Sequence, residues 1–126
     1  PGQGALAVEC RLDDIELRGL LAPLDDADTR ACVVAERSML ATLEAGCAAP
    51  VGGLGEVVEG FEGAELSLRG VVCSLDGQVE LRRSLVGPVD QAADLGIRLA
   101  TILLEDGAAD LVSPSPSVQQ PVEHHL

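Results

Sequence analysis

The sequence predicts an α+β fold, in which a three-stranded antiparallel sheet carries helices packed on one face. Apolar residues recur at helical spacing over residues 28–44 and 88–106, and they alternate with polar residues between these two stretches. Asp76-Gly77 separates two alternating runs, which is typical of a β-hairpin. The chain has 126 residues, of which 47% are hydrophobic, so it is long enough to form one domain with its own core.

The start of the chain is expected to be a strand followed by an amphipathic stretch that Pro23 interrupts. Residues 5–10 form an apolar, strand-like run after a glycine turn. A stripe of apolar residues at imperfect helical spacing follows: Leu12, Ile15, Leu20 and Leu21. A strand at the end of a chain, with no hairpin partner, would leave an unpaired edge. We therefore expect the chain to be a fragment of a longer protein.

The first long helix is predicted to run from Asp28 or Thr29, either of which can cap it, to about Glu44. Gly46 is well placed to end it. Helical spacing predicts four buried positions: Ala31, Val34, Ala35 and Leu40.

Three antiparallel strands are predicted next, over residues 56–59, 65–74 and 78–86. Alternation places one set of residues in the second strand on a common face: Leu66, Leu68, Gly70 and Val72. In the third strand the corresponding residues are Val79, Leu81 and Leu85.

A last long helix is predicted to begin at Gly87-Pro88 and to end near Asp106, with Gly107 just beyond it. Its buried stripe is expected to be Val89, Ala92, Ala93, Gly96, Leu99, Ala100 and Leu103. A further helical turn is predicted over residues 108–112. The tail, residues 113–126, is rich in Pro, Ser and Gln and is expected to be disordered.

The charge excludes several classes of partner. Eight basic residues, all arginine, face 21 acidic ones, which gives a formal net charge of −13. Such a chain repels phosphate backbones and anionic lipids, so nucleic acids and membrane surfaces are poor partners. No apolar run is long enough to span a bilayer and no signal peptide is present, so we expect a cytoplasmic protein.

The four cysteines show neither a CxxC pair nor a Cys/His cluster, so neither a metal site nor a disulfide framework is expected. His124 and His125 are adjacent in the tail, where a metal site is not expected either. Cys10, Cys32 and Cys73 are expected to be small buried hydrophobes. Cys47 differs, because it lies in a glycine-rich loop after the first long helix. The helix dipole there raises the pKa of a thiol, so Cys47 suits an accessible thiol that meets a strong electrophile better than a protease nucleophile.

Three blocks of the sequence, GQGALAVECR, AERSMLATLEAGCAAPVGG and ELSLRGVVCSLDG, resemble in that order the C-terminal part of the porphobilinogen deaminase (hydroxymethylbilane synthase) family. The resemblance covers about residues 1–112. One departure is that Ala45 stands where the family has its first loop glycine, whereas Gly46, Cys47, Pro50 and Gly52 match.

The resemblance implies a transferase of tetrapyrrole (heme) biosynthesis. Such an enzyme joins four porphobilinogens head to tail onto a dipyrromethane cofactor, releasing ammonia and then hydroxymethylbilane. The cofactor would be held by a thioether to Cys47. Arg11 would pair with the carboxylates of the pyrroles in the cofactor site, and Gln3 and Gly4 would line the substrate cleft. A purely structural role remains the alternative for each of them. Arg11 would then be a solvated arginine at a strand end, and Gln3 and Gly4 would form a turn.

The resemblance also implies a division of the chain: residues 1–24 return to the first domain, residues 25–112 are the cofactor-attachment domain, and the first and second domains are missing partners. The complete enzyme would be a monomer. The catalytic aspartate of the family matches no residue here, so no catalytic residue is named and we expect the fragment alone to be inactive. Two alternatives remain: a small ligand-binding or regulatory module without catalysis, and a redox-sensing thiol protein, which the lack of a resolving partner disfavours.

Overall fold

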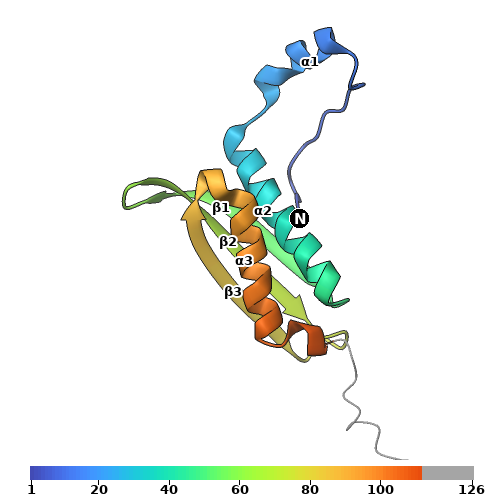
Figure 1. Cartoon of the computed structure of the whole chain (residues 1–126), viewed down its shortest axis with the longest axis vertical. Coiled ribbons are helices and arrows are strands. Elements are labelled where there is room, and N and C mark those ends of the chain that lie inside the picture. Colours follow the sequence, from blue (N-terminus) through green and yellow to red (C-terminus); the bar gives the residue numbers. More distant parts are fainter. Residues whose placement is uncertain (112–126) are drawn as a thin grey trace, which may run out of the picture.

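The computed structural model describes residues 1–111. A helix layer covers one face of a three-stranded sheet, and a leading segment starts beside the helix layer and then projects beyond it (Figure 1). The predicted α+β class and the three antiparallel strands are confirmed, and the strands are ordered β1-β2-β3 in the sheet. The elements are α1 (Ile15–Leu21), a 3₁₀ turn (Ala22–Leu24), α2 (Ala27–Gly46), β1 (Val51–Gly60), β2 (Gly63–Cys73), β3 (Glu80–Pro88), a 3₁₀ turn (Val89–Gln91), α3 (Ala92–Glu105) and a 3₁₀ turn (Ala108–Leu111). The predicted disordered tail lies outside the described residues.

The leading segment, which we define as residues 1–24, departs from its prediction. Residues 5–10, expected to be a strand, are not paired with any strand of the described chain. The expected helix does form as α1, which the Asp14 carboxylate caps by accepting a hydrogen bond from the Leu17 amide at 3.1 Å. None of its residues is buried. A strand needs a neighbour to satisfy its backbone groups, and residues 5–10 have none here.

Helix α2 begins two residues earlier than predicted, because Asp26 caps it. The Asp26 carboxylate accepts hydrogen bonds from the amide and the hydroxyl of Thr29. The buried stripe runs at intervals of four through Ala31, Ala35, Met39 and Leu43, with Glu36 beside it. Val34, predicted to be buried, is 38% exposed, because the small residues Ala31 and Ala35 form the side that approaches α3.

Strand β1 is much longer than the predicted strand over residues 56–59, since it begins at Val51 and includes three glycines. Glycine disfavours strands, so the sequence pattern missed this region. The packing explains the glycines: a Cβ on Gly53 would collide with the Met39 side chain, and one on Gly55 would lie 3.0 Å from Cys32 Cα. The first half of β1 therefore exists because α2 packs closely against it.

The other two strands agree more closely with their predictions. Leu66, Leu68, Gly70 and Val72 of β2 are all buried beneath the helices, as expected. In β3 the half-buried residues are Leu81 and Leu85, whereas Val79 precedes the strand and is 49% exposed.

Helix α3 begins at Ala92, after the 3₁₀ turn that Pro88 precedes, rather than at Pro88 itself. Its buried residues are Ala92, Leu95, Gly96, Leu99, Ala100 and Leu103. Ala93, predicted to be buried, is exposed, and Leu95 takes its place in the stripe. The predicted final turn forms as the 3₁₀ turn at Ala108–Leu111.

Gly96 fixes the spacing of α2 and α3. A Cβ at this position would collide with the Ala35 carbonyl oxygen and lie 2.8 Å from the Met39 amide nitrogen. These are backbone atoms, so a side chain can be accommodated only if the two helices separate.

Replacing Gly96 with alanine is therefore expected to lower the free energy of unfolding by about 1–3 kcal/mol, the usual cost of overpacking. Urea denaturation measures this loss. Gly19→Ala is the matched control, because nothing lies within 4 Å of a Cβ at that helical position. An unchanged unfolding midpoint for Gly96→Ala would show that the helices are not held at this distance.

The helix cap gives a prediction for acid conditions. Hydrogen bonds from Thr29 lower the pKa of the Asp26 carboxyl below its ordinary value of 3.8. Because the folded pKa is the lower one, the ionised cap stabilises the protein above about pH 4, and this contribution is lost as the pH falls through the folded pKa. Asn is an equally good cap that does not titrate. Relative to Asp26→Asn, the wild type should lose thermal stability as the pH falls from 6 to 3. An equal decrease in the unfolding temperature of both proteins would contradict the prediction.

Candidate functional site

Cys47 lies at the C-terminal end of α2, as the residue that caps the helix. Its amide donates the last helical hydrogen bond, to the Leu43 carbonyl at 2.7 Å, and its own backbone is extended, with φ −158° and ψ 158°. The side chain is half-buried and packs against the edge of the core. Gly46 is the last residue of the helix, and a Cβ on it would lie 2.8 Å from the Leu104 side chain, so glycine lets α3 approach closely here.

The loop that carries Cys47 is short and held at both ends. It spans residues 47–50, since Gly52 and Gly53, which were expected to be loop residues, belong to β1. The Pro50 carbonyl accepts a hydrogen bond from the Cys73 amide at 3.0 Å, which joins the loop to the end of β2. The thiol is therefore partly accessible on a backbone that α2 and the sheet both hold in place.

All four cysteines are free in this structure. Cys32 packs against the core, as expected, whereas Cys10 and Cys73 are half-buried outside the core cluster. Burial, with a smaller contribution from the Glu36 charge, raises the pKa of the Cys32 thiol. Deprotonation of the Cys32 thiol is therefore disfavoured.

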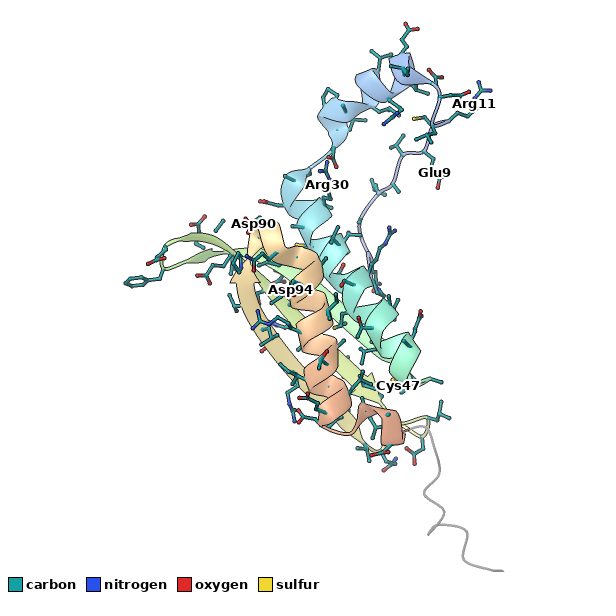
Figure 2. The ribbon with its side chains drawn as sticks, in the orientation of Figure 1. Glu9, Arg11, Arg30, Cys47, Asp90 and Asp94 are labelled. Atoms are coloured by element: carbon teal, nitrogen blue, oxygen red, sulfur yellow. The ribbon has the colours of Figure 1, made fainter. Side chains whose placement is uncertain are left out.

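Arg11 lies far from Cys47. Figure 2 shows the two residues at opposite ends of the molecule, with Arg11 on the leading segment near α1 and Cys47 at the far end of α2. Arg11 is exposed and forms no ion pair with any residue of the described chain. The described residues therefore do not bring the two predicted cofactor-binding residues together.

Gln3 and Gly4 lie in a turn at the start of the chain. The Ala5 amide donates to the Gly2 carbonyl at 3.0 Å, and both Gly2 and Gly4 have positive φ, at 72° and 86°. Gln3 lines a hollow on the sheet, whereas Gly4 lines a groove of about 710 Å³ between the leading segment and α2. Cys47 lines neither of these two cavities.

Glu36 is a buried carboxylate that the sequence analysis missed. It is 5% exposed, and each of its oxygens accepts a backbone hydrogen bond: Oε2 from the Gly2 amide at 3.1 Å and Oε1 from the Gly55 amide at 3.2 Å. Glu36 thereby fastens the start of the chain to the free edge of β1. The signal that could have found it is an acid within the buried stripe of α2, between Ala35 and Met39.

The described residues offer one kind of chemistry at this site, that of a half-buried thiol. Among residues 1–111, no group of three or more His, Cys, Asp or Glu side chains is arranged to hold a metal ion. His124 and His125 lie outside this part of the chain. No helix among the described residues is long and apolar enough to cross a membrane.

Comparison with known proteins identifies relatives of the chain. Residues 30–105 match the family model described as porphobilinogen deaminase, C-terminal domain. The chain is 55% identical over 117 residues to a porphobilinogen deaminase of Mycolicibacterium gilvum, which covers 89% of this chain and 38% of the relative. It is 57% identical over 117 residues to a porphobilinogen deaminase of Nocardia farcinica, covering 89% of this chain and 34% of the relative.

A third relative, a porphobilinogen deaminase of Mycobacterium avium, is 54% identical over 118 residues, covering 90% of this chain and 38% of the relative. The chain thus spans between 34% and 38% of the length of these three curated relatives.

The two hydrogen bonds accepted by Glu36 predict that replacing this residue changes both amide hydrogen exchange and stability. Glu36→Ala should expose the Gly55 amide and release residues 1–4, at a cost of about 1–3 kcal/mol, because a buried donor loses a charged acceptor. Hydrogen exchange should show faster exchange at Gly55, and urea denaturation the loss of stability. Glu44→Gln, at an exposed position of the same helix, is the control and should change neither. Unaltered exchange at Gly55 in Glu36→Ala would contradict the proposed role of the carboxylate.

Proposed function

Because the chain belongs to the porphobilinogen deaminase family, as its C-terminal domain, we propose that Cys47 is the residue that carries a dipyrromethane cofactor through a thioether. The observation that supports this most directly is the position of the thiol. Cys47 is half-buried, it caps α2, and it stands on a four-residue loop whose far end is joined to β2. Such a thiol can be reached by a ligand while its Cα is held still.

The chemistry required of Cys47 is modest. Its S–H bond breaks and an S–C bond forms to an electrophilic methylene of a pyrrole that has lost ammonia, with the proton going to the pyrrole nitrogen. An electrophile of this kind needs no base beside the thiol. When bound, the dipyrromethane supplies the terminal pyrrole carbon onto which four porphobilinogens are added head to tail, before hydroxymethylbilane is released. The contribution of this chain is to hold the attachment point at a fixed place.

Arg11, Gln3 and Gly4 belong to the same proposal as groups of the substrate cleft. Arg11 would pair with acetate and propionate carboxylates on the pyrroles. In the described chain it stands at the opposite end of α2 from Cys47 (Figure 2). The role we propose for it therefore depends on how the leading segment packs in the longer protein, and on the two-thirds of the relatives that lies outside this match.

The leading segment has the surface expected of a segment that packs on another domain. Helix α1 buries none of its residues. Seven large apolar side chains of the leading segment are exposed by more than a third: Leu6, Val8, Leu12, Ile15, Leu17, Leu20 and Leu24. An exposed apolar set of this size marks an interface. We propose that residues 1–24 complete the first domain of the longer enzyme and that residues 25–112 form its cofactor-attachment domain.

The charge supports the proposal that the other domains do the catalysis. Each porphobilinogen brings two carboxylates, so the growing chain of pyrroles is a polyanion. A chain with a net charge of −13 repels it. We infer that the first and second domains supply most of the cationic groups and the catalytic acid, and that this chain alone releases no ammonia. As a separate part of the proposal, the complete enzyme works as a monomer in the cytoplasm.

The test of the proposal is an intact mass of the chain and of the full-length enzyme, with Ehrlich's reagent as a colour test. The full-length enzyme should carry the extra mass of a dipyrromethane, which Cys47→Ser should abolish and Cys73→Ser should leave in place. The chain alone should show its bare mass, a free thiol at Cys47 and no ammonia release from porphobilinogen.

Two results would contradict the proposal. Retention of the extra mass in Cys47→Ser would exclude Cys47 as the attachment residue, and ammonia release by the chain alone would show that it carries catalytic groups of its own.

A further inference from the structure

One face of the sheet is covered by α2 and α3, and the other, which we call the outer face, is left uncovered by the described elements (Figure 1). The outer face holds a hollow of about 730 Å³ at the end of the sheet where β1 begins. We call it the arginine hollow and define it by six residues: Gly52, Leu54, Arg69, Val71, Arg82 and Ser84. The register places these residues in two adjacent rows across the three strands, Gly52 with Val71 and Arg82, and Leu54 with Arg69 and Ser84.

The floor of the hollow is apolar. A Cβ on Gly52 would lie 3.0 Å from Val71 Cγ1, so the glycine lets this valine pack closely against the backbone of β1. Leu54, in the next row, is 47% exposed and forms the neighbouring wall. The floor can therefore receive a flat apolar group.

The rim carries two guanidinium groups in a chain that is otherwise strongly acidic. Arg82 is oriented by Glu80, whose two carboxylate oxygens lie 2.8 Å and 3.3 Å from its Nε and Nη2. Arg69 stands on the next strand, diagonal to Arg82, and forms no ion pair within residues 1–111. The residues that line the hollow include no acidic side chain, and Arg69 is the arginine there whose charge is left unpaired by the described residues. Arg83 does not add to this charge, because its side chain pairs with Asp106 at 2.7 Å, at the end of α3.

Two uncharged polar groups complete the rim. The Ser84 side chain stands directly across from Arg69. Gln3 reaches the hollow from the leading segment, whose start is held in place by the hydrogen bond from the Gly2 amide to Glu36. An amide and a hydroxyl beside two guanidiniums provide further hydrogen bonds for carboxylate oxygens.

From these features we propose that the arginine hollow binds a small organic anion that carries two carboxylates on a flat apolar body. A guanidinium pairs with a carboxylate through two parallel hydrogen bonds, and Arg69 is free to bind one carboxylate in this way. Arg82 uses Nε and Nη2 toward Glu80 and keeps Nη1 as a donor to a second carboxylate. An inorganic anion would leave the apolar floor unused, and a neutral flat molecule would leave Arg69 unpaired. The volume lies within the range of small-molecule sites. The inference does not depend on Cys47 or on the proposed function.

The test is a titration of the 126-residue chain with benzene-1,3-dicarboxylate, followed by amide chemical shifts. We expect saturable shifts confined to the hollow, reported by the amides of Gly52, Gly70 and Val71. Arg69→Gln should weaken the binding at least about tenfold, because a charged bidentate contact is lost. Arg98→Gln makes the same change of charge at an exposed position of α3 and should bind as the wild type does.

Two further probes separate charge from shape. Benzene-1,3-dicarboxamide, which has the same ring without the charges, should not bind, and inorganic phosphate should bind at least tenfold more weakly than the dicarboxylate. The inference is overturned if the dicarboxylate gives no saturable shifts, if Arg69→Gln binds it as tightly as the wild type, or if phosphate binds equally well. Because the readout does not involve Cys47 or ammonia release, its failure leaves the proposed function untouched.

Discussion

Met39 is fully buried between the helices and the sheet, where its neighbours include three glycines, Gly53, Gly70 and Gly96. Its Sδ and Cε atoms occupy the space over Gly70 and Gly53, and its backbone lies against Gly96 of α3. Three glycines from three elements thus meet one methionine, and each lets a backbone approach more closely than an alanine would. The spacing of α2, α3 and the first half of β1 depends on this contact. Replacing Gly96 would force the two helices apart, because the nearest atoms there are backbone, whereas at Gly53 and Gly70 the neighbouring side chains would have to move.

The position of the candidate site follows from the position of α2. This helix is 20 residues long and carries a distinct polar feature at its start, its middle and its end. Asp26 caps its first turn, Glu36 fastens the start of the chain to β1, and Cys47 stands where the helix gives way to the sheet. Any change in packing that moves α2 also moves the thiol, so the position of Cys47 depends on the packing of the core.

The charges of the chain are unevenly placed. The net charge of −13 is spread over the surface, while three of the eight basic residues, Arg69, Arg82 and Arg83, lie on two neighbouring strands at one end of the sheet. Glu80 and Asp106 neutralise two of them, and Arg69 keeps its charge free within the described residues. This leaves the outer face as a place for an anion on a chain that repels most anions, which is the physical basis of the arginine hollow.

The sequence by itself determined the α+β class, the second strand with its buried face, the hairpin at Asp76-Gly77 and the existence of both long helices. These follow from local periodicity and turn chemistry, which act over a few residues. It also placed Cys47 just after a helix and singled it out among four cysteines. Only the tertiary structure decided that Gly52, Gly53 and Gly55 belong to a strand. Their closest contacts come from Val71, Met39 and Cys32 respectively, all more than ten residues away. It likewise decided that residues 5–10 remain unpaired, that Val34 faces outward and that Glu36 is buried. Each of these depends on which element lies alongside, and that choice is made by packing between distant parts of the chain rather than by any local pattern.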